Sequence, residues 1–377
     1  MDTPARMKIL HLCNKVPYPG RDGSSLAMEA LIRLEKMAGH EVHVLALNTD
    51  KHFVERPEPI DGIEFEAIPV RVSPSLKGLW KHLSHPASYF AARFDHVSVQ
   101  KRIRVLSSKV DVIVVDSIFM AVYLDAFGAT PWILRAHNVE HQIWERTLRS
   151  MPFGVKKLFT AWQTSRLKHW EIQTLQGGNV WAISEEDGAN IRQLGASRVL
   201  ALPCTYDPQG PWASSGAAGQ GVYHLGALDW LPNIQGLRWY LDRVHPMVNV
   251  PVTVISKTWP NSLVQPPGIT HLPRLADGFD FDQHGIFIAP ILSGSGMRIK
   301  LLEAMVRGKA IVTTSIGAEG LKNAPGIAVE DDPSTFAAAI QRLVQDPEFR
   351  IQQGKAAQEH ATATFADDVF VETLKTL

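Results

Sequence analysis

Runs of consecutive apolar residues recur along the first half of the chain, and segments with helical periodicity separate them. Continuous Val, Ile and Leu, in place of strict alternation, is typical of strands buried on both faces of a parallel sheet. A Gly/Ser loop at 20–25 and a helix from Leu26 to Met37 connect the first two runs and so predict a βαβ unit. The predicted strands lie at 9–13, 41–47, 63–68, 110–115, 132–136 and 179–183.

The same alternation returns in the second half. Apolar runs predict further strands at 223–226, 252–256, 286–289 and 310–313. Helices are expected after Pro232, around Lys300 to Val306, and from Pro333 onward.

A stretch without periodicity separates these two halves. Residues from Cys204 to Gly221 are rich in Gly, Pro, Ser and Ala, a composition typical of a flexible linker. We therefore predict an α/β chain with domains at 1–203 and 222–360 and a linker at 204–221. A last helix at 361–377 is a candidate to cross back to the first domain.

Composition excludes several classes of protein. Of the 377 residues, 45% are apolar and 20% are charged, which rules out intrinsic disorder. Lys plus Arg and Asp plus Glu each number 38, so net charge gives no reason to expect a nucleic-acid partner. The two cysteines, Cys13 and Cys204, can form neither a disulfide framework nor a zinc site. Because no apolar run reaches about 20 residues, we expect a soluble cytoplasmic protein.

Two stretches of the first half, 71–109 and 144–171, combine basic and aromatic residues. One interpretation is a solvated basic face over a packed aromatic one. The other is a surface that rests on anionic lipid headgroups, where each Lys or Arg contributes about 1 kcal/mol. The first stretch includes Lys77, Trp80, Lys81, Tyr89, Phe90, Phe94, Lys101, Arg102 and Arg104, and the second includes Trp144, Phe153, Phe159, Trp162 and Trp170.

The most informative segment runs from the strand end at Ala289 into a Gly/Ser turn and a helix that we expect to begin near Gly296. Such a turn presents free backbone N–H groups and the positive end of the helix dipole. Arg298 and Lys300 lie in the first turn, where a structural helix favours acids. This pattern predicts a bound anion, for which a diphosphate fits. Glu303 either shares that pocket or pairs with Lys300 on an exposed helix.

Residues 290–304 and 308–321 resemble the donor-binding motif of the retaining GT-B glycosyltransferases of family 4. Weaker likenesses occur at 226–233, in the loop at 16–23 and at 135–140, so that the resemblance covers nearly the whole chain in order. It implies two Rossmann-like domains whose parallel sheets face each other across a cleft. The first domain would bind the acceptor, and the second a nucleotide sugar.

The resemblance also implies site residues. Glu303 would bind the ribose hydroxyls, Arg298 and Lys300 would neutralise the diphosphate, and His137 would contact the sugar or position the acceptor. The implied catalytic residues are His137, Arg298 and Lys300. The implied donor-binding residues are Gly294, Ser295, Gly296, Met297, Arg298, Lys300, Leu302, Glu303 and Glu319. The loop near the acceptor or sugar would comprise Asp22, Gly23, Ser24, Asn138 and Glu140.

Three positions depart from the family pattern. Ser295 stands where the common form has the first of two glutamates, so that sugar selectivity must use other groups. Ala227 follows the first glycine of the second domain, where the common form has a basic residue. The glycine loop has Gly20 and Gly23 in place of an adjacent pair.

The implied activity is retaining transfer of a hexose from a UDP or GDP sugar to a glycan or polyprenyl-linked acceptor, in bacterial cell-surface polysaccharide biosynthesis. No Asp-x-Asp cluster appears, so we expect no metal or other cofactor. Location at the inner face of the cytoplasmic membrane would follow if the basic stretches bind lipid. Two alternatives stay open: a nucleotide-sugar 2-epimerase of the same fold, and a non-catalytic nucleotide-sugar-binding scaffold, which Ser295 keeps in view.

Overall fold

The computed structural model describes residues 6–20, 22–73, 85–212, 214–273, 279–294, 296–321 and 323–375. The chain divides into two compact units. The first comprises Met1–Thr205 together with Asp367–Leu377, and the second comprises Tyr206–Ala366.

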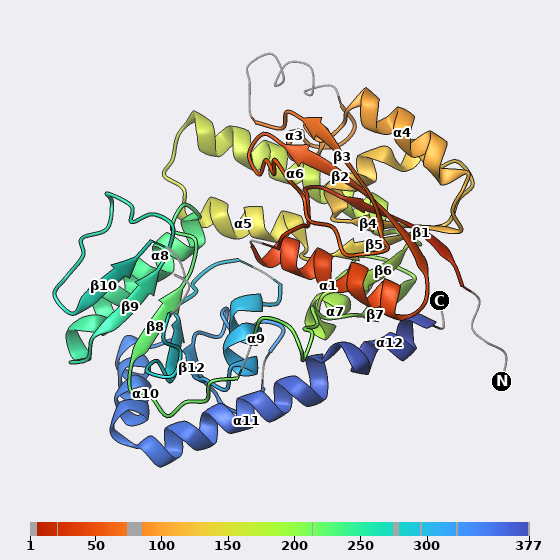
Figure 1. Cartoon of the computed structure of the whole chain (residues 1–377). Coiled ribbons are helices and arrows are strands. Elements are labelled where there is room, and N and C mark those ends of the chain that lie inside the picture. Colours follow the sequence, from red (N-terminus) through yellow and green to blue (C-terminus); the bar gives the residue numbers. More distant parts are fainter. Residues whose placement is uncertain are drawn as a thin grey trace. The chain divides into compact units, whose positions relative to one another are not determined.

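The first unit is built on a seven-stranded sheet in the order β3-β2-β1-β4-β5-β6-β7 (Figure 1). Every pair of neighbouring strands is parallel. Since β1 lies between β2 and β4, the strand order reverses direction beside β1, as in a Rossmann sheet. The strands are β1 (Lys8–Cys13), β2 (Glu41–Thr49), β3 (Glu64–Val70), β4 (Val112–Asp116), β5 (Trp132–Ala136), β6 (Asn179–Ala182) and β7 (Arg198–Ala201).

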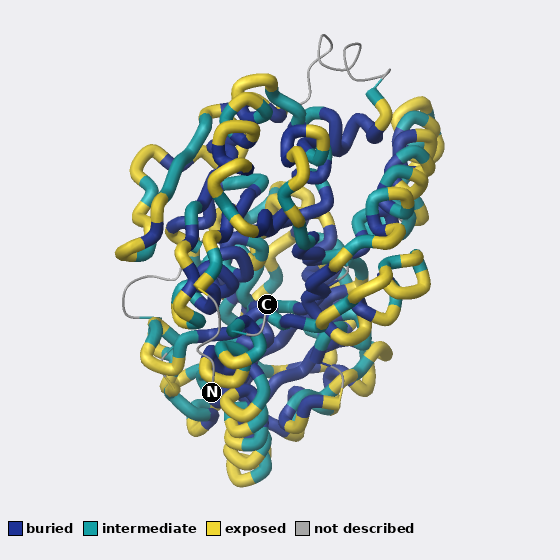
Figure 2. Tube along the Cα trace, turned by 90° about the vertical axis from the view of Figure 1, so that its right-hand side faces the viewer, coloured by how far each residue is buried: buried dark blue, intermediate teal, exposed yellow. Residues whose placement is uncertain are grey.

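Apolar side chains cover both faces of this sheet, which explains the continuous runs in the sequence. Leu10 and Leu12 face one core cluster, whereas Ile9 faces another that includes Leu31 and Leu34. Figure 2 shows buried residues inside and exposed residues on the outer helices. The helical segments are α1 (Gly23–Met37), α3 (Tyr89–Ala92), α4 (Val97–Ser107), η1 (Ile118–Ala126), α5 (Glu140–Ser150), α6 (Val155–Leu175), α7 (Glu185–Gln193) and α12 (Asp367–Lys375).

The C-terminal helix α12 is part of the first unit. The Arg33 guanidinium of α1 donates to Asp367 with Nε 2.6 Å from Oδ2, and Leu374 is fully buried in the cluster with Leu31 and Leu34. The chain therefore returns to the first unit after the second is complete.

Both cysteines belong to the first unit, and both are buried free thiols. Burial raises the pKa of Cys13 to about 11 and that of Cys204 to about 12. At neutral pH both are therefore protonated and hidden from reagents while the unit is folded.

The second unit has a six-stranded parallel sheet in the order β10-β9-β8-β11-β12-β13. This sheet again has the Rossmann order, with the reversal beside β8. Two parallel sheets with covering helices confirm the predicted α/β fold class. The elements are β8 (Val222–Leu225), α8 (Leu231–Trp239), η2 (Tyr240–Val244), η3 (His245–Met247), β9 (Val252–Ile255), β10 (Ile269–Leu272), β11 (Ile286–Ala289), α9 (Ile299–Val306), β12 (Ala310–Thr313), β13 (Ile327–Val329), α10 (Pro333–Gln345) and α11 (Pro347–Phe365).

The strip expected as a flexible linker, 204–221, is held within the second unit from Tyr206 onward. Arg350 donates to the carbonyls of Ala217 and Ala218, each at 2.8 Å, and the Lys309 amine donates to Gly216 O at 2.6 Å. These two buried cations lie far along the sequence from the strip. The composition of the strip predicted a flexible backbone. In the structure, the side chains of Arg350 and Lys309 hold part of that backbone in place.

Within the described residues, no helix is both long enough and apolar enough to span a bilayer.

Candidate functional site

Two edges of the molecule meet the geometric rule for ligand sites in open α/β sheets. Ligands bind beyond the carboxyl ends of the strands, where the strand order reverses. In the second unit this is the edge where β8 and β11 end, and in the first unit it is the edge where β1 and β4 end. The residues suggested by the sequence fall on these two edges, which are described in turn.

In the second unit, the turn after β11 leads into the N-terminus of α9. Gly294 and Gly296 have φ of 121° and 80°, in the left-handed region that favours glycine. These conformations keep both residues out of the helix, so α9 begins at Ile299 and not near Gly296 as expected. Ser295 lies outside the described residues.

Glycine also sets how closely α8 packs on this turn. A Cβ at Gly236 would lie 1.7 Å from the carbonyl oxygen of Pro290, so no larger residue fits there. The backbone after β11 is thus fixed against α8, as a preformed phosphate cradle requires.

Arg298 joins this turn to the loop after β12. Its Nη2 lies 3.7 Å from Oε2 of Glu319 and donates to the carbonyl of Ile316 at 3.4 Å. The structure therefore brings Arg298 and Glu319 together, as the sequence suggested for the donor side. Arg298 is also the N-cap of α9, where its side chain makes no capping hydrogen bond.

Lys300 points from α9 toward the end of β8. Its Nζ lies 3.3 Å from Oδ1 of Asn233, and a Cβ built on Gly226 would lie 3.5 Å from the same amine. Among the described residues, no carboxylate forms an ion pair with Lys300. Burial, with the nearby charge of Arg298, lowers the pKa of Lys300 to about 7. An anion bound beside this amine would restore its charge.

Glu303 pairs with Arg307 and not with Lys300. Its Oε1 accepts from Nε of Arg307 at 3.0 Å and from Nη2 at 2.9 Å, whereas its Oε2 makes no hydrogen bond to any described residue. Arg307 also stacks on Phe281, with the guanidinium carbon 4.0 Å from the ring centre. Of the two interpretations of Glu303 given above, pairing with Lys300 is therefore wrong. Arg307, its actual partner, was missed by the sequence analysis.

The other two donor-side residues suggested by the sequence are buried. Leu302 is 0% exposed and Met297 is 7% exposed. Met297 packs on Gly320, where a Cβ would approach its Cα to 3.1 Å. Both side chains support the turn by packing.

The edge of the first unit holds a chain of four buried polar side chains. Nδ1 of His11 lies 3.0 Å from Oε2 of Glu35, and Nε2 of His11 lies 2.9 Å from Oδ2 of Asp116. Nε2 of His137 donates to the other oxygen of Asp116. The chain thus links α1, β1, β4 and the residue that follows β5.

Opposite charges set the protonation of this chain. Burial by itself would lower the pKa of His11, but Glu35 and Asp116 raise it well above its usual value. Burial alone would raise the pKa of Asp116, but His137 and His11 hold it well below its usual range. The sequence pointed to His137 but missed Glu35 and His11, although a histidine inside an apolar strand was a visible signal.

The glycine-loop residues lie at the start of α1. Asp22 caps the helix by accepting from Ser25 N at 3.0 Å, and Gly23 is the first helical residue, followed by Ser24. Lys15, which the sequence analysis did not single out, donates to Asp22 at 2.8 Å. Although burial favours the neutral acid, Lys15 holds the pKa of Asp22 below its usual value.

Asn138 and Glu140 follow His137 at the start of α5. Asn138 donates to Glu140 at 3.4 Å. Glu171 of α6 accepts from the backbone N–H groups of Glu140 and His141, at 2.9 and 3.0 Å, and so caps α5. Burial and the charge of Glu171 raise the pKa of Glu140 to about 7. Glu171, another residue that the sequence analysis missed, therefore positions the segment that carries His137.

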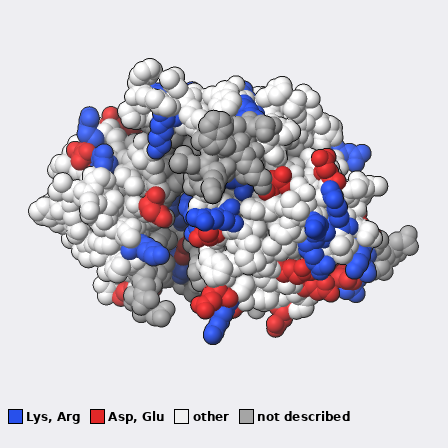
Figure 3. All heavy atoms as spheres, turned by 90° about the horizontal axis from the view of Figure 1, so that it is seen from above, with Lys and Arg blue, Asp and Glu red and all other residues white. Residues whose placement is uncertain are grey.

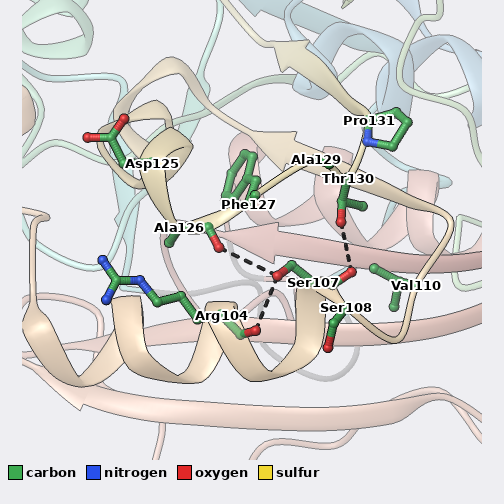
Figure 4. Close-up of a pocket in the computed structure, with 11 residues that line it drawn as sticks. Arg104, Ser107, Ser108, Val110, Asp125, Ala126, Phe127, Ala129, Thr130 and Pro131 are labelled. Atoms are coloured by element: carbon green, nitrogen blue, oxygen red, sulfur yellow. Dashed lines mark hydrogen bonds between the residues drawn. The ribbon is translucent and has the colours of Figure 1, made fainter.

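A pocket of about 610 Å³ lies at the opposite edge of the same sheet, where β4 and β5 begin (Figure 4). The Thr130 hydroxyl donates to the Ser107 carbonyl at 2.8 Å, and the Ser107 hydroxyl donates to the carbonyl of Ala126 at 3.5 Å. These bonds connect the end of α4 to the end of η1 and to the loop before β5. The pocket therefore does not lie at the carboxyl ends of the strands.

In the part of the chain that the structure describes, no group of three or more His, Cys, Asp or Glu side chains is arranged to hold a metal ion.

Comparison with known proteins agrees with the geometry of the second unit. Residues 219–346 match the family model described as glycosyl transferases group 1. An uncharacterized 44.6 kDa protein in the cps region of Klebsiella pneumoniae is 25% identical over 369 residues, which cover 88% of this chain and 90% of that protein.

Solved structures share the fold over the whole chain. Sucrose-phosphate synthase from Thermosynechococcus elongatus superposes with a TM-score of 0.68 at 15% identity, covering 97% of each chain. HepE from Anabaena, in complex with UDP-glucose, gives 0.63 at 15% identity, covering 98% of each chain. The chain therefore has the GT-B fold, and its residues 219–346 match a glycosyl transferases group 1 domain, which indicates a transferase.

Proposed function

We propose that this chain is a retaining hexosyltransferase that uses a nucleotide diphosphate sugar as donor and a glycan or lipid-linked glycan as acceptor. The observation that carries the proposal is the partly buried Lys300 amine, which has no carboxylate partner among the described residues and lies at the N-terminus of α9 in the matched domain. A cation that is partly withdrawn from solvent is stabilised when an anion binds beside it.

The proposed chemistry uses this charge directly. The bond between the anomeric carbon and the diphosphate oxygen breaks, and negative charge develops on the leaving group. Arg298, Lys300 and the N–H groups that precede α9 are placed to stabilise that charge, which is commonly the largest contribution a protein makes. We expect this arrangement to work without a metal ion, so that turnover in excess chelator should equal turnover with added Mg²⁺ or Mn²⁺.

The hydrogen bonds of Glu303 and His137 suggest the roles of these two residues. Oε2 of Glu303 is available for the ribose hydroxyls, because Arg307 occupies only Oε1. The leaving phosphate oxygen would take the proton of the attacking hydroxyl on the same face of the sugar. His137, held by Asp116, would donate a hydrogen bond to the sugar or acceptor.

We propose UDP as the nucleotide to test first, since HepE was solved in complex with UDP-glucose. The likeness to the protein in the cps region supports a role in bacterial cell-surface polysaccharide biosynthesis. The enzyme would then act in the cytoplasm, at the inner face of the membrane that carries its acceptor.

The turn between α5 and α6, together with the first residues of α6, supports contact with anionic lipid. Phe153 is 87% exposed, Val155 84% and Leu158 58%, and Lys156 beside them is also exposed. An exposed apolar group with neighbouring cations is typical of surfaces that rest on headgroups. Trp162 is also 48% exposed, whereas Phe90 and Trp144 stack with their ring centres 4.0 Å apart. Lys77, Trp80 and Lys81 lie outside the described residues.

On the face that Figure 3 shows, Lys and Arg side chains lie among Asp and Glu and do not form one uniform basic patch. We therefore expect lipid contact through this turn. Phe153→Ser with Leu158→Ser should abolish sedimentation with phosphatidylglycerol vesicles. Val97→Ser, a change at a residue 62% exposed on α4, should leave it intact. Equal binding by both variants would contradict the lipid contact.

One experiment separates the three candidate functions. The full-length protein is titrated calorimetrically with UDP, GDP and their hexose conjugates, and reactions with the ligand that binds are followed by proton NMR, with and without lipid-linked glycan. Transfer with retained anomeric configuration supports the proposal. Inversion at C2 without acceptor would indicate the epimerase. Binding without any turnover would indicate a scaffold.

A further inference from the structure

Glu35, His11, Asp116 and His137 form one continuous chain of hydrogen bonds inside the first unit. The first three side chains are 0% exposed, whereas His137 is 8% exposed. Because they come from α1, β1, β4 and the end of β5, the chain runs from the interior of the unit to the strand-end edge. Only its last member lies where a substrate could reach it.

The contacts of His11 determine its protons. A neutral imidazole has one N–H donor and one acceptor nitrogen. Both nitrogens of His11 face carboxylate oxygens, at 3.0 Å on the Glu35 side and 2.9 Å on the Asp116 side. Both bonds form together when His11 is an imidazolium. His11 is thus a buried cation between two anions.

The other titratable groups around this chain complete the charge balance. Arg135 of β5 is 1% exposed, donates to the carbonyls of Ala182 and Leu202, and lies close enough to Asp116 and Glu35 to interact with both electrostatically. Cys13 of β1 remains a neutral thiol. Two anions and two cations therefore balance, and the charge on Asp116 is shared between Arg135, His11 and His137.

We propose that His11 is a positioning residue for the reaction: as an imidazolium clamped by Glu35, it orients Asp116 and sets how much of the Asp116 charge acts on His137. Asp116 in turn keeps a hydrogen on Nε2 of His137 and so fixes the orientation of the His137 ring. This inference rests on the proposed function, because it assigns the substrate-facing role to His137.

Two substitutions should move the titration of His137 in opposite directions. His11→Gln removes a cation beside Asp116, so His137 should hold its proton to higher pH. Asp116→Asn removes the anion, so His137 should lose its proton at lower pH, by about one pH unit or more. The measurement is the pH titration of ring ¹⁵N shifts in the full-length protein labelled with [¹⁵N]histidine, with the His137 signal assigned from its absence in His137→Gln.

A matched control lies in the same sheet. His43 of β2 also sits between two carboxylates, with Nδ1 2.9 Å from Glu64 and Nε2 3.0 Å from Glu66. His43→Gln should leave the His137 titration unchanged. A His11→Gln titration that matches the wild type, or that moves in the same direction as that of Asp116→Asn, overturns the proposal.

A double substitution keeps the test usable if His11→Gln folds poorly. His11→Gln with Glu35→Gln removes one cation and one anion together. It should melt at a higher temperature than His11→Gln alone, and its His137 titration should shift less. If the double variant is no more stable than His11→Gln, the proposal that Glu35 holds His11 as an imidazolium is wrong.

Kinetics then connect the chain to turnover. The basic limb of the kcat profile should move to higher pH in His11→Gln and to lower pH in Asp116→Asn, whereas a purely structural role would lower kcat equally at every pH. The NMR titration needs no substrate, so it can succeed even if no nucleotide sugar is turned over. Failure of the proposed function is thereby distinguished from failure of this inference.

Discussion

The two strand-end edges are built alike but treat charge in opposite ways. In the first unit, the carboxylates of Glu35 and Asp116 enclose His11, so that the buried charges are neutralised by the protein itself. In the second unit, Lys300 is partly buried, its Nζ lies 3.3 Å from Oδ1 of Asn233, and no carboxylate among the described residues pairs with it. The first edge balances its charges without a ligand, whereas under the proposed function an anion would complete the second. Under the proposed function, the comparison teaches that one edge would orient a substrate and the other would bind its negative charge.

The largest effect is expected from breaking the internally balanced edge. Asp116→Ala leaves the His11 cation and His137 without their shared acceptor, and removal of one partner from a buried pair costs about 3–5 kcal/mol. The measurement is the free energy of unfolding in urea. Asp111→Ala, at the other end of the same strand, loses only an exposed bond to Lys8 N and should cost about 1 kcal/mol or less. Equal losses of unfolding free energy in the two variants would mean that the hydrogen bonds among Glu35, His11, Asp116 and His137 do not stabilise the first unit.

The next largest effect is expected at the edge of the second unit, where we propose that the diphosphate binds. Arg298→Ala with Lys300→Ala removes the cations nearest the proposed leaving group, so kcat should fall about 10²–10³-fold while the KM for the donor rises far less. Initial rates over a range of donor concentrations measure both. Lys355→Ala, an exposed helix position, is the control. If KM alone changes, the two cations merely bind the diphosphate.

A smaller loss is expected for the proposed ribose contact. Glu303→Ala should weaken binding of the nucleotide sugar by about 1–3 kcal/mol, the scale of a charged hydrogen bond. Calorimetry measures this affinity directly. Arg307→Ala breaks the same internal ion pair but keeps the carboxylate, so it should retain more affinity. If the Arg307 variant loses as much as the Glu303 variant, the carboxylate acts through Arg307 and not on ribose.

The smallest effect is a pH dependence of binding. The pKa of Lys300 is lowered to about 7 in the free protein, and a bound diphosphate would raise it, so binding takes up a proton. Affinity should therefore be nearly constant below pH 7 and fall by up to about tenfold per pH unit above it. Calorimetry in buffers of different ionisation enthalpy measures the proton uptake. In Lys300→Met this slope should vanish, and a slope that survives would assign it to another group.

The apolar runs were enough to predict the central strands of the two parallel sheets, because strands buried on both faces leave a direct record in the sequence. They missed the less buried edge strands β7, β10 and β13. The turn after Ala289 was predictable for a similar reason, since glycine and cations are local signals. The hydrogen bonds of His11 were not predictable, because Glu35 and Asp116 lie 24 and 105 residues away in the sequence. Only the folded sheet brings these three residues together. The same holds for Arg350, which fixes the strip expected to be a linker from 133 residues away.

The position of the two thiols has a practical consequence. Cys13 and Cys204 are both enclosed in the first unit, and nothing in the second unit reacts with thiol reagents, since SH groups occur at these two positions alone in the sequence. The rate at which a maleimide labels the native protein therefore records how often the first unit opens. Without any introduced cysteine, maleimide labelling reports the stability of the first unit alone. A nucleotide that slows this labelling would reveal that the two units are energetically coupled.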